Sequence, residues 1–69
     1  SLEKASRQFD IITMVEPTNA EAYYNRGLCK ELIKKYAEAQ EDYQQALVFD
    51  AQNKNTKDAL KRIQTFIKK

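Results

Sequence analysis

Residues 20–53, AEAYYNRGLCKELIKKYAEAQEDYQQALVFDAQN, decide how this chain folds. Apolar residues recur in them every three or four positions, which is the period of an amphipathic helix. The pattern breaks once, at Lys34 and Lys35. The stretch therefore predicts two helices, about 20–33 and 36–50. Because short connections keep consecutive helices adjacent, we expect them to form an antiparallel hairpin.

The segment before this hairpin predicts another helix, over about 1–15. Pro17 ends it, because the residue before a proline is disfavoured in helical geometry and proline donates no backbone hydrogen bond. Thr18 or Asn19 is suited to cap the helix that follows. The apolar stripe of the first helix consists of Leu2, Ala5, Phe9, Ile12 and Val15, with Ile11 beside it.

The segment after the hairpin predicts a fourth helix, over about 55–68, with Asn55 or Thr56 as its N-cap. A single glycine and a single proline among 69 residues leave little room for loops. We therefore predict an all-α fold in one domain, residues 1–69. The apolar stripe of the fourth helix consists of Ala59, Leu60, Ile63, Phe66 and Ile67.

The composition excludes several kinds of site. The chain has no histidine, and its single cysteine, Cys29, excludes an internal disulfide and a zinc site of the usual Cys and His type. We therefore expect no metal and no cofactor. Cys29 has no evident base near it in the pattern and is interpreted as a small buried hydrophobe, so we expect no enzymatic activity.

The chain shows no apolar run near the roughly 18 residues that a membrane span requires, and no signal-peptide pattern. We expect a protein of the cytoplasm that does not insert into a membrane.

Charge is divided unevenly along the chain. Residues 1–53 carry six Lys and Arg against nine Asp and Glu, whereas residues 54–69 carry six against one. We interpret the basic last helix as a solvated outer face. Because no exposed aromatic residue is expected between its basic residues, the pattern does not favour binding of nucleic acid. The carboxylates of Glu38, Glu41 and Asp42 are expected to lie on the solvated side of their helix.

Within residues 20–53, small and aromatic residues have the spacing of the tetratricopeptide repeat, a helix–turn–helix unit with a period of 34 residues. A shift by this period places Ala5 on Ala39 and Phe9 on Tyr43, so that residues 1–19 resemble the second half of a preceding repeat. The resemblance implies that seven residues pack the repeats together: Ala5, Phe9, Tyr23, Gly27, Ala39, Tyr43 and Ala46.

The same shift places lysines on Tyr23 and Gly27, so residues 54–69 lack the packing residues of a repeat. They resemble the capping helix that follows the last repeat in this family. The whole chain then resembles a fragment of a right-handed α-solenoid, in which antiparallel hairpins are stacked. A polar outer face is what the end of such a stack requires.

The chain departs from the family pattern at four positions. The family usually has leucine where this chain has Arg26, tyrosine at Lys30, glycine in the turn near Lys34 and proline at Ala51. We expect these differences to alter details of packing rather than the fold, because the stems of long basic side chains can lie on apolar surface.

The resemblance implies a module for binding another protein, whose peptide or helix would lie on the concave surface made by the first helix of each repeat. Such modules are typically parts of scaffold or adaptor proteins. Tyr24 offers an amphipathic ring, Asn25 can both donate and accept hydrogen bonds, and Leu28 offers an apolar floor. In the alternative interpretation these residues are merely exposed beside the core. The expected concave surface consists of Glu21, Tyr24, Asn25, Leu28, Glu31 and Leu32.

A narrower hypothesis concerns chaperones. Residues 23–26, Tyr-Tyr-Asn-Arg, resemble the segment with which co-chaperones of this family clamp the C-terminal carboxylate of heat-shock proteins. Asn25 matches the clamp asparagine, but Asn55 and Ala59 stand where the family has lysine and arginine. Because one exposed ion pair contributes only about 0–1 kcal/mol, several cations must converge on a carboxylate. We therefore expect this chain by itself not to bind such a tail.

A different class of hypothesis is self-association. The first helix is expected to leave an apolar edge that no other helix of the chain covers, and uncovered apolar edges of repeat proteins tend to associate. The chain would then form a homo-oligomer through its N-terminal helix.

Overall fold

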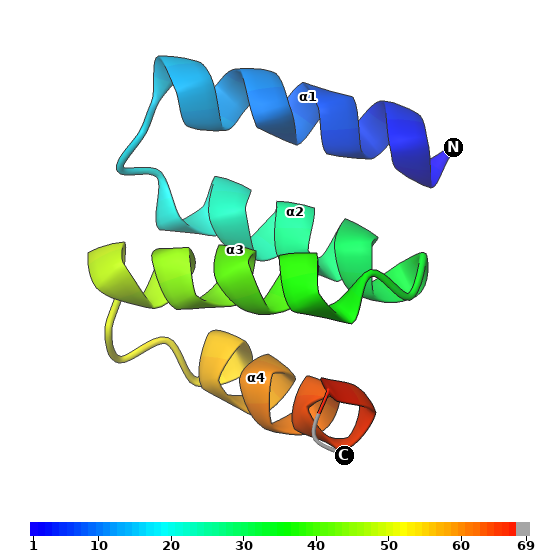
Figure 1. The fold of residues 1–69 in the computed structure, drawn as a ribbon. Helices are drawn as coiled ribbons and strands as arrows, with labels where there is room; N and C mark the ends of the chain where they lie inside the picture. The colour runs from blue at the N-terminus through cyan, green and yellow to red at the C-terminus, as the bar shows by residue number, and fades with distance from the viewer. Residues whose placement is uncertain (68–69) are drawn as a thin grey trace.

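The computed structural model describes residues 1–67, which form four α-helices and no strand (Figure 1). Each helix packs against its neighbour in the sequence, and the most extensive contact is between the second and third. The predicted all-α fold of antiparallel hairpins is confirmed. Residue 68, the last position of the predicted fourth helix, lies outside the described residues. The helices are α1 (Leu2–Val15), α2 (Ala20–Leu32), α3 (Tyr36–Phe49) and α4 (Lys54–Ile67).

Asparagines cap the beginnings of α2 and α4. The side-chain oxygen of Asn19 accepts a hydrogen bond from the backbone amide of Ala22 at 3.1 Å. In the same way, Asn53 accepts from the amide of Thr56 at 2.9 Å. The predicted caps of α4, Asn55 and Thr56, are wrong, because the helix begins at Lys54 and its cap is the residue before it.

The core lies where α3 is packed between α2 and α4. Ala39, Tyr43, Ala59 and Ile63 form its fully buried cluster. A β-carbon placed on Gly27 would lie 2.7 Å from Cε1 of Tyr43, which is closer than any real van der Waals contact allows. Gly27 therefore sits in the middle of a helix, where glycine is unfavourable, because the aromatic ring of Tyr43 lies directly on its backbone.

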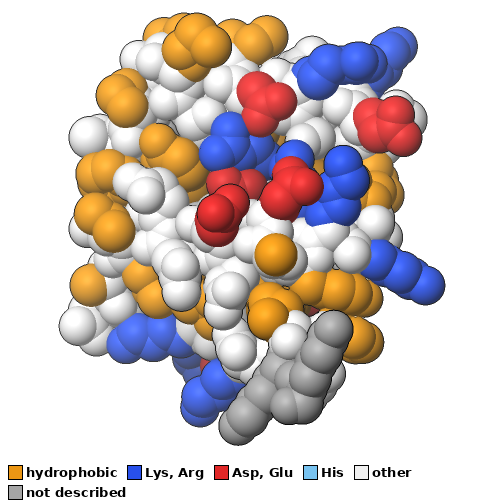
Figure 2. All heavy atoms as spheres, viewed as in Figure 1, with side chains coloured by type: hydrophobic (Ala, Val, Ile, Leu, Met, Phe, Trp, Pro, Cys, Tyr) orange, Lys and Arg blue, Asp and Glu red, His pale blue; other side chains and the backbone are white. Residues whose placement is uncertain are grey.

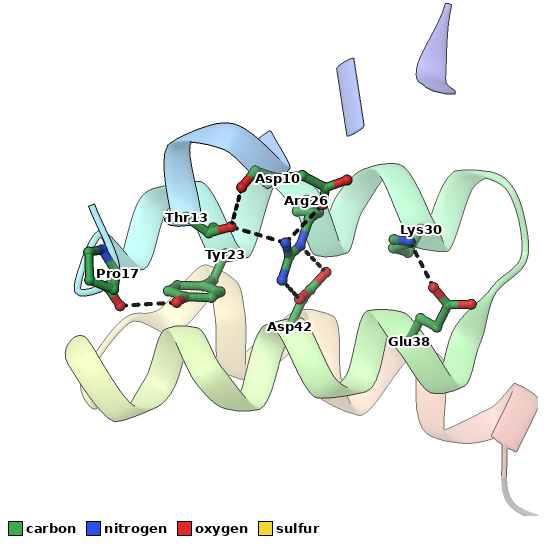
Figure 3. A network of polar contacts seen from close by, with 8 residues as sticks. All are labelled: Asp10, Thr13, Pro17, Tyr23, Arg26, Lys30, Glu38 and Asp42. Atoms are coloured by element: carbon green, nitrogen blue, oxygen red, sulfur yellow. Dashed lines mark hydrogen bonds and ion pairs between the residues drawn. The ribbon is translucent and has the colours of Figure 1, made fainter. Parts of the chain in front are cut away.

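Arg26 of α2 joins three helices (Figure 3). Its guanidinium donates to both carboxylate oxygens of Asp42 on α3, from Nε at 3.0 Å and from Nη2 at 2.7 Å. Its Nη1 donates to Asp10 at 2.9 Å and to the hydroxyl of Thr13 at 3.0 Å, both on α1. The two carboxylates raise the pKa of Arg26, chiefly through the hydrogen bonds of Asp42.

The structure contradicts the prediction that Asp42 lies on a solvated face, because Asp42 is buried against Arg26. The other two residues of that prediction, Glu38 and Glu41, are exposed. Glu38 accepts a hydrogen bond from the ammonium of Lys30 at 2.8 Å, which raises the pKa of Lys30 (Figure 3).

The buried face of α1 differs from the predicted apolar stripe. Leu2 and Val15 are exposed, whereas Ser6 and Thr13 are buried. The reason is that α1 packs chiefly on α2, and the face it turns there includes the Thr13 hydroxyl that Arg26 contacts. Phe9 is half-buried at this interface.

α2 ends in a Schellman motif at the turn that leads to α3. The amide of Lys35 donates to the carbonyl of Lys30 at 2.8 Å, and the amide of Lys34 donates to that of Glu31 at 2.9 Å. This geometry places Lys34 at a φ of 66°, in the left-handed region. Lysine at this position has a β-carbon that crowds the following carbonyl, and glycine does not.

Replacing Lys34 with glycine is expected to stabilise the fold by about 1 kcal/mol, because it removes the cost of a left-handed β-carbon. Thermal or urea unfolding of the Lys34→Gly chain measures the gain. Lys34→Ala, which keeps the β-carbon, is the matched control and is expected to give no comparable gain. Equal stabilisation by both substitutions would contradict the explanation.

The two carboxylates around Arg26 are expected to contribute unequally. The side chain of Asp42 is 8% exposed and that of Asp10 is 51% exposed. Asp42→Asn should destabilise the fold by about 1–3 kcal/mol, because it leaves a buried polar pair mismatched. Asp10→Asn should cost less than about 1 kcal/mol, because water screens that pair. Urea unfolding of both variants checks the order, and a larger loss for Asp10→Asn would contradict it.

Candidate functional site

A pocket of about 330 Å³ lies between the beginnings of α2 and α4. Both helices pack on α3, and their first turns lie at the same end of the molecule (Figure 1). The residues that line the pocket come from the first half of α2, from the connection between α3 and α4, and from the first turn of α4. They are Ala20, Glu21, Tyr24, Asn25, Asp50, Asn53, Asn55 and Thr56.

Three residues of the expected concave surface meet in this pocket: Glu21, Tyr24 and Asn25. They lie on successive turns of one face of α2, since residues three and four positions apart are neighbours on a helix. Glu21 is exposed, and the other two are half-buried. The ring of Tyr24 packs against the core and lies 5.8 Å from that of Tyr43, measured between ring centroids.

The other three residues of the expected surface lie further along α2 and do not line the pocket. Leu28 is half-buried and packs against the core cluster. Leu32 is 65% exposed. The carboxylate of Glu31 accepts hydrogen bonds from side chains of α3 and α4. The expected surface therefore has two ends. The end at Glu21, Tyr24 and Asn25 opens into the pocket, whereas at the other end the carboxylate of Glu31 is already hydrogen-bonded within the chain.

Glu31 links α2 to both following helices. It accepts a hydrogen bond from the hydroxyl of Tyr43 at 2.7 Å. Arg62 donates to its two carboxylate oxygens, from Nε at 2.6 Å and from Nη2 at 2.8 Å. The hydrogen bonds from Arg62, and then that from Tyr43, hold the pKa of Glu31 below its ordinary value. Burial and the neighbouring carboxylate raise the pKa of Tyr43.

One wall of the pocket was missed by the prediction from sequence, and it is made by the cap of α4. Asn53 accepts from the amide and the hydroxyl of Thr56, and its own amide donates to Asp50 at 3.1 Å. The same arrangement occurs one repeat earlier, where Asn19 donates to Glu16 at 3.1 Å. A shift by 34 residues places Glu16 on Asp50 and Asn19 on Asn53, so the period contained a signal for this wall.

The charges at the pocket have one sign. Its only lining residues of the Asp, Glu, Lys and Arg types are Glu21 and Asp50, and both are exposed. The remaining polar groups are the amides of three asparagines, one phenol and one hydroxyl. Such a lining can donate and accept hydrogen bonds. No group of three or more His, Cys, Asp or Glu residues placed to hold a metal ion occurs in residues 1–67.

The residues expected to pack the repeat lie away from this pocket. Ala39, Tyr43 and Ala46 are at most 1% exposed. The hydroxyl of Tyr23 donates to the carbonyl of Pro17 at 3.0 Å, and its ring stacks on that of Phe49. On α1, the packing residues Ala5 and Phe9 are half-buried, whereas Gly27 of α2 is buried.

Cys29 is buried, and burial raises the pKa of its thiol. A buried thiol with a raised pKa is a poor nucleophile. No helix within the described part of the chain is long and apolar enough to cross a membrane.

Comparison with known proteins matches residues 20–53 to the family model described as tetratricopeptide repeat. Neither the search of curated proteins nor the search of solved structures found a match. Repeats of this family mediate interactions between proteins, and the repeat itself is not catalytic. The matched residues coincide with α2, α3 and the cap of α4, and include Gly27 under the ring of Tyr43. Residues 20–53 of this chain are a tetratricopeptide repeat.

Proposed function

We propose that this chain binds a peptide or helix of another protein on the side formed by α2 and α4, as one module of a scaffold or adaptor. The observation that carries the proposal is the pocket in which Tyr24 and Asn25 meet the cap of α4. Its groups come from two helices that are held apart by α3. A segment that lay across them would contact both at once.

The chemistry of the surface suits a polypeptide. Asn25 makes no side-chain hydrogen bond within residues 1–67, so its amide is free to pair with a partner's backbone. Tyr24 contributes an aromatic surface that is already fixed by the core and loses little entropy on binding. Leu28 extends this surface towards the Glu31 end. Glu31 and Leu32 would border the bound segment.

The electrostatics argue against a clamp for a C-terminal carboxylate. The pocket around Asn25 contains no Lys or Arg among its lining residues. On α4, Arg62 contacts α2, and its guanidinium is bound to Glu31. A carboxylate at Asn25 would therefore meet carboxylates and no cation. We propose that chaperone tails are not ligands of this chain.

Asn25→Ala is expected to weaken partner binding about tenfold, because it removes an amide that pairs with the bound segment. The chain is used as bait, and the captured proteins are quantified for wild type and variant. Gln44→Ala, on the exposed face of α3, is the matched control and should retain the same proteins. Leu28→Ala, with its helicity checked by circular dichroism, is a second test. Identical capture by the Asn25 variant would contradict the proposal.

A second candidate function is self-association through α1. Its outer face carries Ile11, Met14 and Val15, which are 61, 80 and 72% exposed. Figure 2 shows hydrophobic side chains at the edge of the molecule over α1. Because α1 packs chiefly on α2 and leaves these side chains exposed, a second copy could cover this face. This surface is separate from the pocket, so the two functions can be tested independently.

If α1 mediates association, light scattering at millimolar protein should report dimers or larger species for the wild-type chain. Met14→Glu should shift the population to monomer, because it places a charge in an apolar contact. Gln44→Glu adds the same charge on α3 and should have no effect. A monomeric wild-type chain at that concentration would contradict self-association and leave partner binding at Asn25 unaffected.

A further inference from the structure

We propose that the pocket between the first turns of α2 and α4 receives a basic side chain, Lys or Arg, of the bound partner segment. This inference rests on the proposed function and specifies the chemistry of the partner. It is drawn from the sign of the charges on the two walls and from the way each cation near them is oriented or engaged.

The pocket carries negative charge from both sides. Glu21 contributes a carboxylate from α2, and Asp50 contributes one from the connection before α4. Asp58 follows the lining residue Asn55 by three positions, so it lies on the same face of α4 one turn along. All three carboxylates are on exposed residues, and none of them forms an ion pair within residues 1–67. They are therefore free to meet a cation from outside.

Three of the cations of α4 are turned away or already paired, and the fourth, Lys54 in the first turn, is exposed and does not line the pocket. At about 100° per residue, Lys57 and Lys61 lie roughly 200° and 240° around the helix from Asn55. Lys57 extends to the side chain of Gln52, with 3.5 Å between Nζ and Oε1. Arg62 does lie on the face of Asn55, but both oxygens of Glu31 hold its guanidinium. The basic residues of α4 therefore do not line the pocket.

The beginnings of two helices also meet at this pocket, and each carries a partial positive charge of about half an elementary unit. This effect is smaller than that of the carboxylates. Asn19 and Asn53 already accept hydrogen bonds from the first-turn amides of Ala22 and Thr56. Two full negative charges, on Glu21 and Asp50, exceed what remains of the two partial positive charges. The pocket therefore attracts a cation rather than an anion.

The amides complete a site of the right kind for a basic residue in a peptide. The side chains of Asn25 and Asn55 line the pocket, and neither is hydrogen-bonded to another residue of the described chain. They can pair with the peptide backbone on either side of the basic residue. The ring of Tyr24, between Glu21 and Asn25, offers a face against which an alkyl stem can lie.

The experiment selects peptides from a random nine-residue library displayed on phage, using the immobilised chain. Selected sequences should be enriched in Lys and Arg, and the best peptide should shift the amide NMR signals of Asn25 and Asn55. Its affinity should fall about fivefold to tenfold in the Glu21→Gln/Asp50→Asn chain, since each exposed ion pair contributes up to about fivefold. Its affinity should also fall with rising salt.

Glu3→Gln/Glu41→Gln removes two exposed carboxylates that do not line the pocket, and it should leave the affinity unchanged. Unfolding curves of both double variants check that the fold is retained. Neutral or acidic peptides that shift Asn25 would overturn the basic specificity and leave the proposed function standing. So would an unchanged affinity in the pocket variant. If no selected peptide shifts Asn25 or Asn55, the proposed function fails together with this inference.

Discussion

The hydrogen bonds of Arg26 with Asp42 are the interaction on which the arrangement of the first three helices depends. A carboxylate as buried as Asp42 is unfavourable unless a cation satisfies both of its oxygens. Arg26 does so with a planar pair of donors, which fixes the rotation of α2 against α3 as well as their distance. Its remaining donors bind Asp10 and Thr13, so the same guanidinium also sets how α1 lies on α2. Figure 2 shows side chains of both charges gathered on the face of the molecule over these helices.

Most of the fold could be predicted from local signals. Apolar residues at helical spacing located the four helices, and Pro17 located the end of α1 to within a residue or two. The burial of Asp42 could not be predicted in this way, because hydrophobic periodicity assigns charged residues to the surface and its partner lies 16 residues away. One signal was present: Arg26 stands where the family usually has leucine. A cation placed at an apolar packing position requires an anion opposite it.

The wall of the candidate site on α2 was predicted from the sequence, and the wall made by the cap of α4 was missed. Glu21, Tyr24 and Asn25 follow from helical spacing on α2 alone. Asp50 and Asn53 belong to a helix cap, whose residues have no apolar pattern and are recognised only by comparing them with Glu16 and Asn19 one period earlier. Glu31 was expected on the open surface because its partner Arg62 is 31 residues away, and no rule of sequence spacing connects the two.

Tyr43 connects the packing of the hairpin to the shape of the site. Its ring can cross α2 because Gly27 has no side chain, and this position brings its hydroxyl to Glu31. Glu31, held there, binds Arg62 and so fixes α4 beside α2 at one end of the surface. The other end, at Asn25, stays open because the cap of α4 is held by Asn53 and Thr56 instead. The position of α4 beside α2 thus depends on a glycine, since a larger residue at Gly27 would displace the ring whose hydroxyl holds Glu31 in place.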